Sequence, residues 1–237
     1  MIAGVSKAVT LYLSPILALT SLFLIMFAYL APTVLLHDRV ALLVVSPSTT
    51  LTTNSTSSSN IDGPTVFLGA LGSCSRTSND GDVSCTIPTL SPEYDLSALP
   101  SGAPDMLTAP TSTTPAFIAV SIGFSIIFFV LFTMTSLRGS LGAKMSAALD
   151  KPMIQRTTAW IGLLGFMIGL TAFLVLRMWM GKAVEDFNKD ITEGNSSAEL
   201  IADTSNGFTM IWVGYSFHAV PLICALAKLH VTASAGK

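Results

Sequence analysis

The sequence predicts a mainly α-helical membrane protein: a four-helix transmembrane bundle that carries a small, disulfide-closed extracellular β-sheet. Three observations predict this fold class. The chain is 51% hydrophobic and only 11% charged, with a mean hydropathy of +0.65. Four apolar runs reach the roughly 20 residues needed to cross a bilayer. A cysteine pair, Cys74 and Cys85, lies in the long segment between the first two runs.

Composition also excludes several classes of function. Soluble domains carry about 25% charged residues, so this chain has too few charges to cover a globular surface. A net charge of −2 argues against nucleic acid as a partner. The three cysteines and three histidines show no zinc-ligand spacing, so we expect no metal and no cofactor.

The apolar runs divide the chain into eight segments. The first run is far longer than the roughly 7–15 apolar residues of a signal peptide, which favours an uncleaved first helix. The expected segments are an N-terminus with the first transmembrane helix (1–36), a first extracellular loop (37–115), a second helix (116–137), a cytoplasmic loop (138–156), a third helix (157–180), a second extracellular loop (181–207), a fourth helix (208–229) and a cytoplasmic tail (230–237).

The distribution of Lys and Arg predicts the orientation. The loop 138–156 has four basic residues against the single acid Asp150, whereas the loop 37–115 has two basic residues against seven acids. The positive-inside rule then places both termini in the cytoplasm. Two glycosylation acceptors, Asn54-Ser-Thr and Asn195-Ser-Ser, fall in the loops predicted to lie outside. The chain is therefore expected to be a multi-pass membrane protein with both of these loops facing outward.

The outer loops have recognisable internal patterns. Val40–Val45 and Pro64–Leu68 are β-prone runs, which we expect to pair in a small antiparallel sheet. Ser46–Asn60 between them is almost entirely Ser, Thr and Asn, a composition typical of a tether. The second loop begins with amphipathic spacing that predicts a helical extension of the third span, ending before Asn195.

A glycine–cysteine motif follows the second β-prone run. It reads Gly69-x-x-Gly72-x-Cys74, and ten residues separate Cys74 from Cys85. In an oxidising outer loop this spacing predicts a disulfide, worth roughly 2–4 kcal/mol, with two unpaired thiols as the alternative. Glycine permits tight turns and close approach of another backbone. The motif is therefore expected to hold the sheet together and has no catalytic content.

The third span carries a second group of glycines, Gly162, Gly165 and Gly169, on roughly one face. Small residues let helices approach closely where the hydrophobic effect cannot drive association. We expect these glycines to pack inside this chain's own bundle. An oligomer contact, or no special role, is the alternative.

Four spans with a glycine–cysteine–cysteine motif in a long first outer loop resemble the claudin-like superfamily. The form Gly69-x-x-Gly72-x-Cys74…Cys85 is similar to its fungal branches, and Val40–Ser48 resembles the pattern of the PalI/Sur-seven family. The Fig-one family is the close alternative. Animal claudins have a tryptophan ahead of the glycine–leucine element, but Val66-Phe-Leu-Gly lacks it. The resemblance therefore does not extend to junction or paracellular-pore roles.

The resemblance implies a non-catalytic plasma-membrane organiser or sensor subunit, acting in membrane-domain and cell-wall organisation or in ambient signalling. A Fig-one-like role in calcium influx and membrane fusion during mating is the first alternative. An auxiliary subunit of a larger ion channel is the second. Expected partners are the lipid bilayer and, laterally, other membrane proteins, including a second copy of this chain or a channel.

Few residues suggest chemistry. His218 is an ionisable residue inside the fourth span, where it either makes a structural hydrogen bond or acts in pH sensing or conduction. Ser216 lies two residues away, so it faces another side of the helix, and we predict no enzyme. Cys224 is either a buried thiol or a palmitoylation site. Several acids of the second outer loop suit a solvated surface better than a calcium site, because they lack the EF-hand order: Glu185, Asp186, Asp190, Glu193, Glu199 and Asp203.

Overall fold

The computed structural model describes residues 12–48, 62–138, 142–149, 151–193 and 199–235. These residues form two compact units. The helical unit comprises the described residues of Met1–Met26, Phe117–Ala172 and Ile211–Lys237, and the sheet unit comprises those of Phe27–Ala116 and Phe173–Met210.

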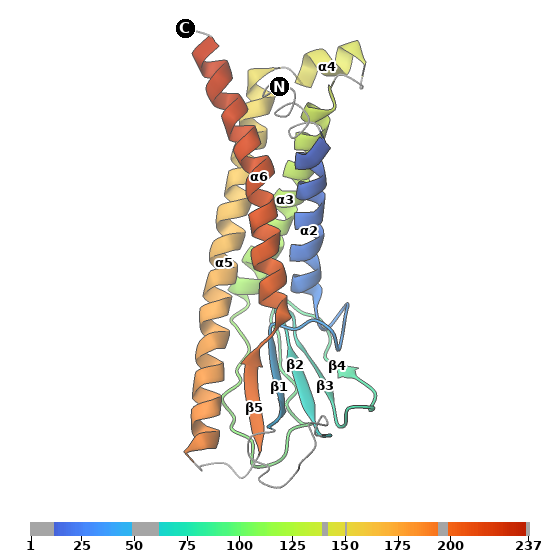
Figure 1. Cartoon of the computed structure of the whole chain (residues 1–237), viewed down its shortest axis with the longest axis vertical. Coiled ribbons are helices and arrows are strands. Elements are labelled where there is room, and N and C mark those ends of the chain that lie inside the picture. The colour runs from blue at the N-terminus through green and yellow to red at the C-terminus, as the bar shows by residue number, and fades with distance from the viewer. Residues whose placement is uncertain (1–11, 49–61, 139–141, 150, 194–198, 236–237) are drawn as a thin grey trace. The chain divides into compact units, whose positions relative to one another are not determined.

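Helices form most of the chain (Figure 1). They are α2 (Ser14–Leu30), α3 (Thr113–Ser136), α4 (Ala143–Leu149), α5 (Pro152–Thr192) and α6 (Asn206–Ala235). A helix satisfies its own backbone hydrogen bonds, which is why long apolar sequence adopts it in lipid.

Three of these helices are long and apolar enough to cross a membrane: α3, α5 and the Asn206–Ala227 part of α6. This confirms the prediction of a mainly α-helical chain with helices able to span a membrane. α2 is also apolar but has 17 residues, or about 26 Å at 1.5 Å per residue, close to the lower limit for a span. Four spans therefore stay a prediction.

Within the helical unit, glycines mark where α2, α3, α5 and α6 meet. A Cβ on Gly162 of α5 would lie 2.5 Å from Cδ2 of Phe128 on α3. A Cβ on Gly214 of α6 would lie 2.9 Å from Cγ1 of Ile25 on α2. Phe128 also stacks on Phe132, with 5.4 Å between ring centroids, and both rings are buried.

α5 continues well past the predicted end of the third span. It runs unbroken to Thr192, so the helical extension predicted for the second outer loop is confirmed. The helix begins earlier than expected, at Pro152, inside the predicted cytoplasmic loop. Proline is favoured in a first helical turn, because the N–H it lacks would have no partner there.

The sheet unit contains a five-stranded antiparallel sheet in the order β4-β3-β2-β1-β5. The small antiparallel sheet was predicted from two runs, which correspond to the first two strands, although β1 begins three residues later than expected. The other three strands were not foreseen. The strands are β1 (Leu43–Pro47), β2 (Thr65–Leu68), β3 (Ser73–Arg76), β4 (Ser84–Cys85) and β5 (Leu200–Thr204).

Both faces of β2 are buried, and β1 is buried on one face and half-buried on the other. Val44, Phe67, Cys74 and Cys85 form one cross-strand row on one face. Their neighbours along the strands point to the opposite face, where four apolar side chains are at most 1% exposed: Leu43, Val45, Val66 and Leu68. Burial on both faces explains why β1 and β2 read as continuous apolar runs rather than as alternating ones.

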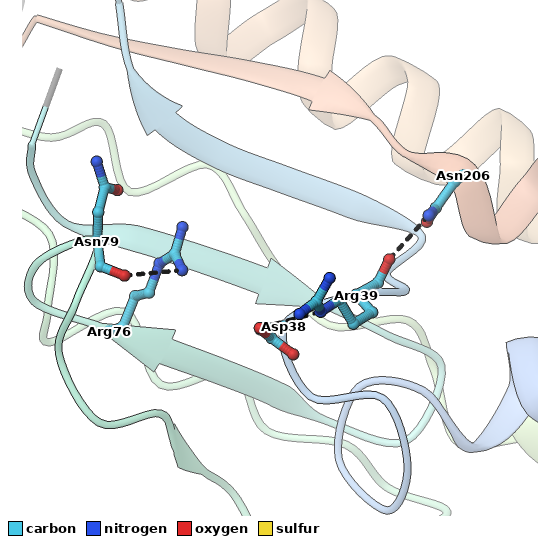
Figure 2. Close-up of polar contacts among 5 residues, drawn as sticks. All are labelled: Asp38, Arg39, Arg76, Asn79 and Asn206. Atoms are coloured by element: carbon cyan, nitrogen blue, oxygen red, sulfur yellow. Dashed lines mark hydrogen bonds and ion pairs between the residues drawn. The ribbon is translucent and has the colours of Figure 1, made fainter. Parts of the chain in front are cut away.

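The pairing of β1 with β5 continues to the first residues of α6. Beyond the last ladder pair, the Ser205 amide donates to the Leu42 carbonyl and the Gly207 amide to the Ala41 carbonyl, each at 2.9 Å. Figure 2 shows Asn206 reaching back to the same segment, where its Nδ2 donates to the Arg39 carbonyl at 2.8 Å. A Cβ on Gly207 would lie 2.5 Å from the Ala41 carbonyl oxygen, so this approach requires glycine.

The outer edge of β5 is bonded by a side chain of α5. Asn188 Nδ2 donates to the Ala202 carbonyl, and the Ala202 amide donates to Asn188 Oδ1, each at 2.8 Å. An uncovered strand edge presents unpaired amides and carbonyls, which favour pairing with another chain. Asn188 therefore satisfies both edge groups of a residue that is only 2% exposed.

Asn188→Ala should destabilise the sheet unit by about 1–3 kcal/mol, because it leaves the buried amide and carbonyl of Ala202 without partners. Hydrogen exchange of the Ala202 amide should become faster. Thr192→Ala is the matched control, since the Thr192 hydroxyl bonds only to Lys189 of its own helix. Equal exchange rates in the two variants would show that Asn188 does not hold this edge.

Candidate functional site around the glycine–cysteine motif

The motif glycines form a turn that lies against the chain just after α2. The Gly69 amide donates to the Gly72 carbonyl at 2.9 Å, which closes the turn. A Cβ on Gly69 would collide with the Ala31 carbonyl oxygen and lie 2.5 Å from Cδ of Pro32. Because backbone atoms cannot give way as a flexible side chain can, this position accepts only glycine.

Gly72 is constrained by both its conformation and its surroundings. Its φ is 154°, which residues with a side chain rarely adopt. A Cβ there would collide with Oγ1 of Thr86 and lie 3.0 Å from Cγ2 of Thr33. The turn thus brings together three stretches of chain: the exit from α2, the motif itself and the residues after β4.

Cys74 and Cys85 form a disulfide, as predicted. They are direct cross-strand partners in β3 and β4. Cys74 is 1% exposed and packs in an apolar cluster with Ala41 and Phe67. The disulfide therefore fastens β4, which is only two residues long, to the rest of the sheet.

An imidazole lies against this disulfide. His37 Nδ1 is 3.4 Å from Sγ of Cys85 and 4.0 Å from Sγ of Cys74. The same nitrogen lies 2.6 Å from the Pro32 carbonyl oxygen, to which it donates a hydrogen bond. Among the described residues this is the one place where three histidine, cysteine or acidic side chains bring their ligand atoms within 4.8 Å of one another.

These three residues do not make a zinc centre in this state. Zinc binds cysteine as the thiolate, and here each sulfur is bonded to the other. The His37 nitrogen that faces the sulfurs is also engaged as a donor to Pro32. The arrangement instead packs a polar ring beside the disulfide at the exposed end of the motif.

The segment after β4 is bonded to the motif along its length. Tyr94 donates its hydroxyl to the Gly69 carbonyl at 2.8 Å, and the Asp95 amide donates to Ser73 Oγ at 2.8 Å. The Thr89 amide donates to the Leu71 carbonyl at 3.1 Å. Sequence reasoning missed these residues. The segment is rich in Pro, Ser and Thr, and such a composition gives no sign that one tyrosine in it donates a hydrogen bond to a distant turn.

The glycines of the third span lie at helix contacts inside the helical unit. Gly162 and Gly165 face Phe128 and Phe124 of α3. A Cβ on Gly169 would collide with the hydroxyls of Ser121 and Tyr215. This is the kind of close approach expected for packing inside the chain's own bundle.

His218 is buried among aromatic rings in the helical unit. It is 2% exposed, and its ring centroid lies 5.3 Å from that of Phe128 and 5.9 Å from that of Phe166. Its Nε2 has no hydrogen-bond partner among the described residues. Ser216 donates to the Trp212 carbonyl of its own helix, so it does not form a Ser–His pair with His218.

The remaining candidates are dispersed. Cys224 Sγ lies 3.5 Å from Ser14 Oγ. Lys182 forms ion pairs with Glu185 and Asp186, and Lys189 with Glu193, at the spacing of ordinary helix-surface pairs. The glycosylation acceptors Asn54 and Asn195 lie outside the described residues.

No protein-family model matches this chain, and no curated protein matches it. The claudin-like resemblance therefore rests on the chain's own motif and on its predicted topology.

Gly165→Val should lower the thermal stability of the helical unit, because a side chain there would meet Cβ of Phe124 at 2.9 Å. Overpacking of this kind costs roughly 1–3 kcal/mol. Gly123→Val in α3 is the control, since no other described residue comes within 4 Å of a Cβ built at Gly123. Thermal unfolding of both variants in the same nanodiscs measures the difference, and equal melting temperatures would refute the packing role.

Tyr94→Phe should destabilise the sheet unit by about 1 kcal/mol at neutral pH, because the Gly69 carbonyl loses its donor. Burial raises the pKa of the Tyr94 phenol above its ordinary value of 10.0. The folded state thus favours the neutral phenol. Its contribution to the free energy of unfolding is complete below pH 10 and is lost as the pH rises toward the pKa of the folded state. The stability gap between wild type and variant should narrow above pH 10 in chemical unfolding. A gap that stays constant from pH 7 to pH 11 would contradict this account.

Proposed function

We propose that this chain is a four-span, claudin-like protein of the fungal plasma membrane, related to the PalI/Sur-seven type. In this proposal α2 is the first span, both termini are cytoplasmic and the sheet unit lies outside the cell. The protein acts as a non-catalytic organiser or sensor subunit. Its helices pack against other membrane proteins, and its sheet contacts the cell wall, lipid headgroups or partner proteins.

The observation that supports this most is the construction of the sheet unit. Both predicted outer loops contribute strands, since β1–β4 come from the first and β5 from the second. A disulfide fastens one edge strand, and Asn188 satisfies part of the other. Such a rigid platform suits recognition, because binding to it costs little ordering entropy.

The charge distribution supports the proposed orientation. The four basic residues between α3 and the apolar part of α5 favour the cytoplasm under the positive-inside rule. The disulfide favours an oxidising compartment for the sheet unit.

The test is live imaging of a copy tagged at the C-terminus in a fungal host, during vegetative growth and after mating induction. Stable cortical patches in vegetative cells are expected for an organiser. Appearance only after induction, concentrated where cells touch, would replace this proposal with the Fig-one-like role in calcium influx and fusion. Co-purification with a single large pore-forming protein would indicate an auxiliary channel subunit.

The same assay tests the role of the sheet unit. Cys74→Ser combined with Cys85→Ser removes the disulfide and should retain the protein in the secretory pathway. Cys224→Ser is the matched control, because Cys224 is the free cysteine of the structure. Normal patches in the double variant would show that an intact sheet unit is not needed for delivery.

A further inference from the structure

Two apolar stretches of the sheet unit run beside each other at the exit from α2. The first is 31–36 and the second is 86–90. Thr33 and Thr86 both face Gly72. A Cβ built on Gly72 would lie 3.0 Å from Cγ2 of Thr33 and closer still to Oγ1 of Thr86. His37 directly follows the first stretch and Cys85 directly precedes the second. His37 Nδ1 lies 3.4 Å from Sγ of Cys85. Contacts at both positions make the stretches neighbours.

Large apolar side chains of these stretches are exposed rather than packed. Ile87 is 82% exposed, the highest value among the large apolar side chains of the described residues. Neither 31–36 nor 86–92 contains a charged residue. We call this surface the exit patch, and its members are Val34 (42% exposed), Leu35 (39%), Leu36 (42%), Ile87 (82%) and Leu90 (50%).

One member of the exit patch, Leu36, has a left-handed backbone conformation. Its φ is 57°, a left-handed conformation that costs a residue with a side chain roughly 1–2 kcal/mol. Strain of this kind persists where the surrounding structure requires it, and it clusters at functional sites. Here it accompanies a leucine that stays 42% exposed.

The position of the exit patch indicates what covers it. The chain leaves α2 through two turn hydrogen bonds, from the Ala31 amide to the Phe27 carbonyl and from the Val34 amide to the Leu30 carbonyl. Val34 is thus four residues beyond the last residue of an apolar helix and is hydrogen-bonded to that residue. A surface so close to the end of a span meets the boundary between lipid headgroups and acyl chains, where exposed apolar side chains are stabilised by insertion.

We propose that the exit patch inserts into the outer leaflet and seats the sheet unit on the membrane surface. This inference rests on the proposed topology, in which α2 spans the bilayer. The motif glycines then have a second consequence: by bringing 31–36 and 86–90 together, they combine two short apolar stretches into one lipid-binding surface. Lipid is the occupant, because 31–36 and 86–90 contain no charged residue and the first of them directly follows the apolar helix α2.

The experiment places tryptophan probes in the full chain, reconstituted with one copy per nanodisc. Ile87→Trp and Val34→Trp report on the exit patch. Thr77→Trp is the matched control, because Thr77 is exposed and follows the end of β3 that points away from Gly72. Leu19→Trp, at a 38% exposed position of α2, reports on the span itself. Signals are taken as differences from wild type, and gel mobility without reductant checks that the disulfide has formed.

Quenching by 6,7-dibromo phosphatidylcholine and by aqueous iodide distinguishes the outcomes. The fluorescence added by Ile87→Trp and Val34→Trp should be blue-shifted and lost in brominated lipid, whereas that added by Thr77→Trp should be lost only to iodide. Iodide quenching of Ile87→Trp without lipid quenching would overturn the proposal. Resistance to both quenchers would also overturn it and would show that protein covers the patch.

Leu19→Trp distinguishes a failure of the lipid-insertion proposal from a failure of the proposed topology. If brominated lipid quenches Leu19→Trp but not Ile87→Trp, the span holds and the exit patch does not bind lipid. If it quenches neither, α2 lies outside the bilayer and both proposals fail.

Discussion

The sheet unit depends on the close approach of one backbone to another at Gly69. The carbonyl of Ala31 occupies the space that any Cβ at Gly69 would need. This contact fixes where the motif turn lies relative to the exit from α2. The positions of the disulfide, of His37 and of the segment that carries Tyr94 all follow from it. The glycines of the motif allow the two backbones to approach this closely, and the disulfide then stabilises the resulting arrangement.

The helices and the disulfide could be predicted from sequence because local patterns determine them. Long apolar runs leave the helix as the conformation that satisfies the backbone in lipid. Two cysteines with ten residues between them can be brought together by a hairpin, and β3 and β4, which contain them, form one. The central strands were recognisable for a similar reason, since Val44, Val45 and Val66 are β-branched residues in short apolar runs.

The rest of the site depends on contacts between residues far apart in the chain, which no local pattern reveals. β5 alternates between buried and exposed side chains, but Leu200-Ile-Ala-Asp-Thr is too short and too mixed to be recognised as a strand. Its partner β1 belongs to the other predicted loop. Asn188 lies on a polar face of α5, which the sequence alone would place in solvent. In the structure its side chain instead donates a hydrogen bond to the Ala202 carbonyl at the edge of β5. Tyr94 is a single aromatic residue in a Pro/Ser/Thr-rich segment, and its bond to Gly69 becomes visible only in three dimensions.

The pairing of β1 with β5 has a consequence for biosynthesis. Residues that adjoin in the sheet, such as Leu43 and Thr204, are separated in the chain by α3 and α5. The β3–β4 hairpin and its disulfide need only the first loop, so they can form early. The sheet then keeps an open edge on β1 until the second loop emerges, and loop-closure entropy makes this last pairing slow. During that interval the nascent chain exposes an unpaired apolar strand, which is the kind of state that chaperones bind until β5 docks.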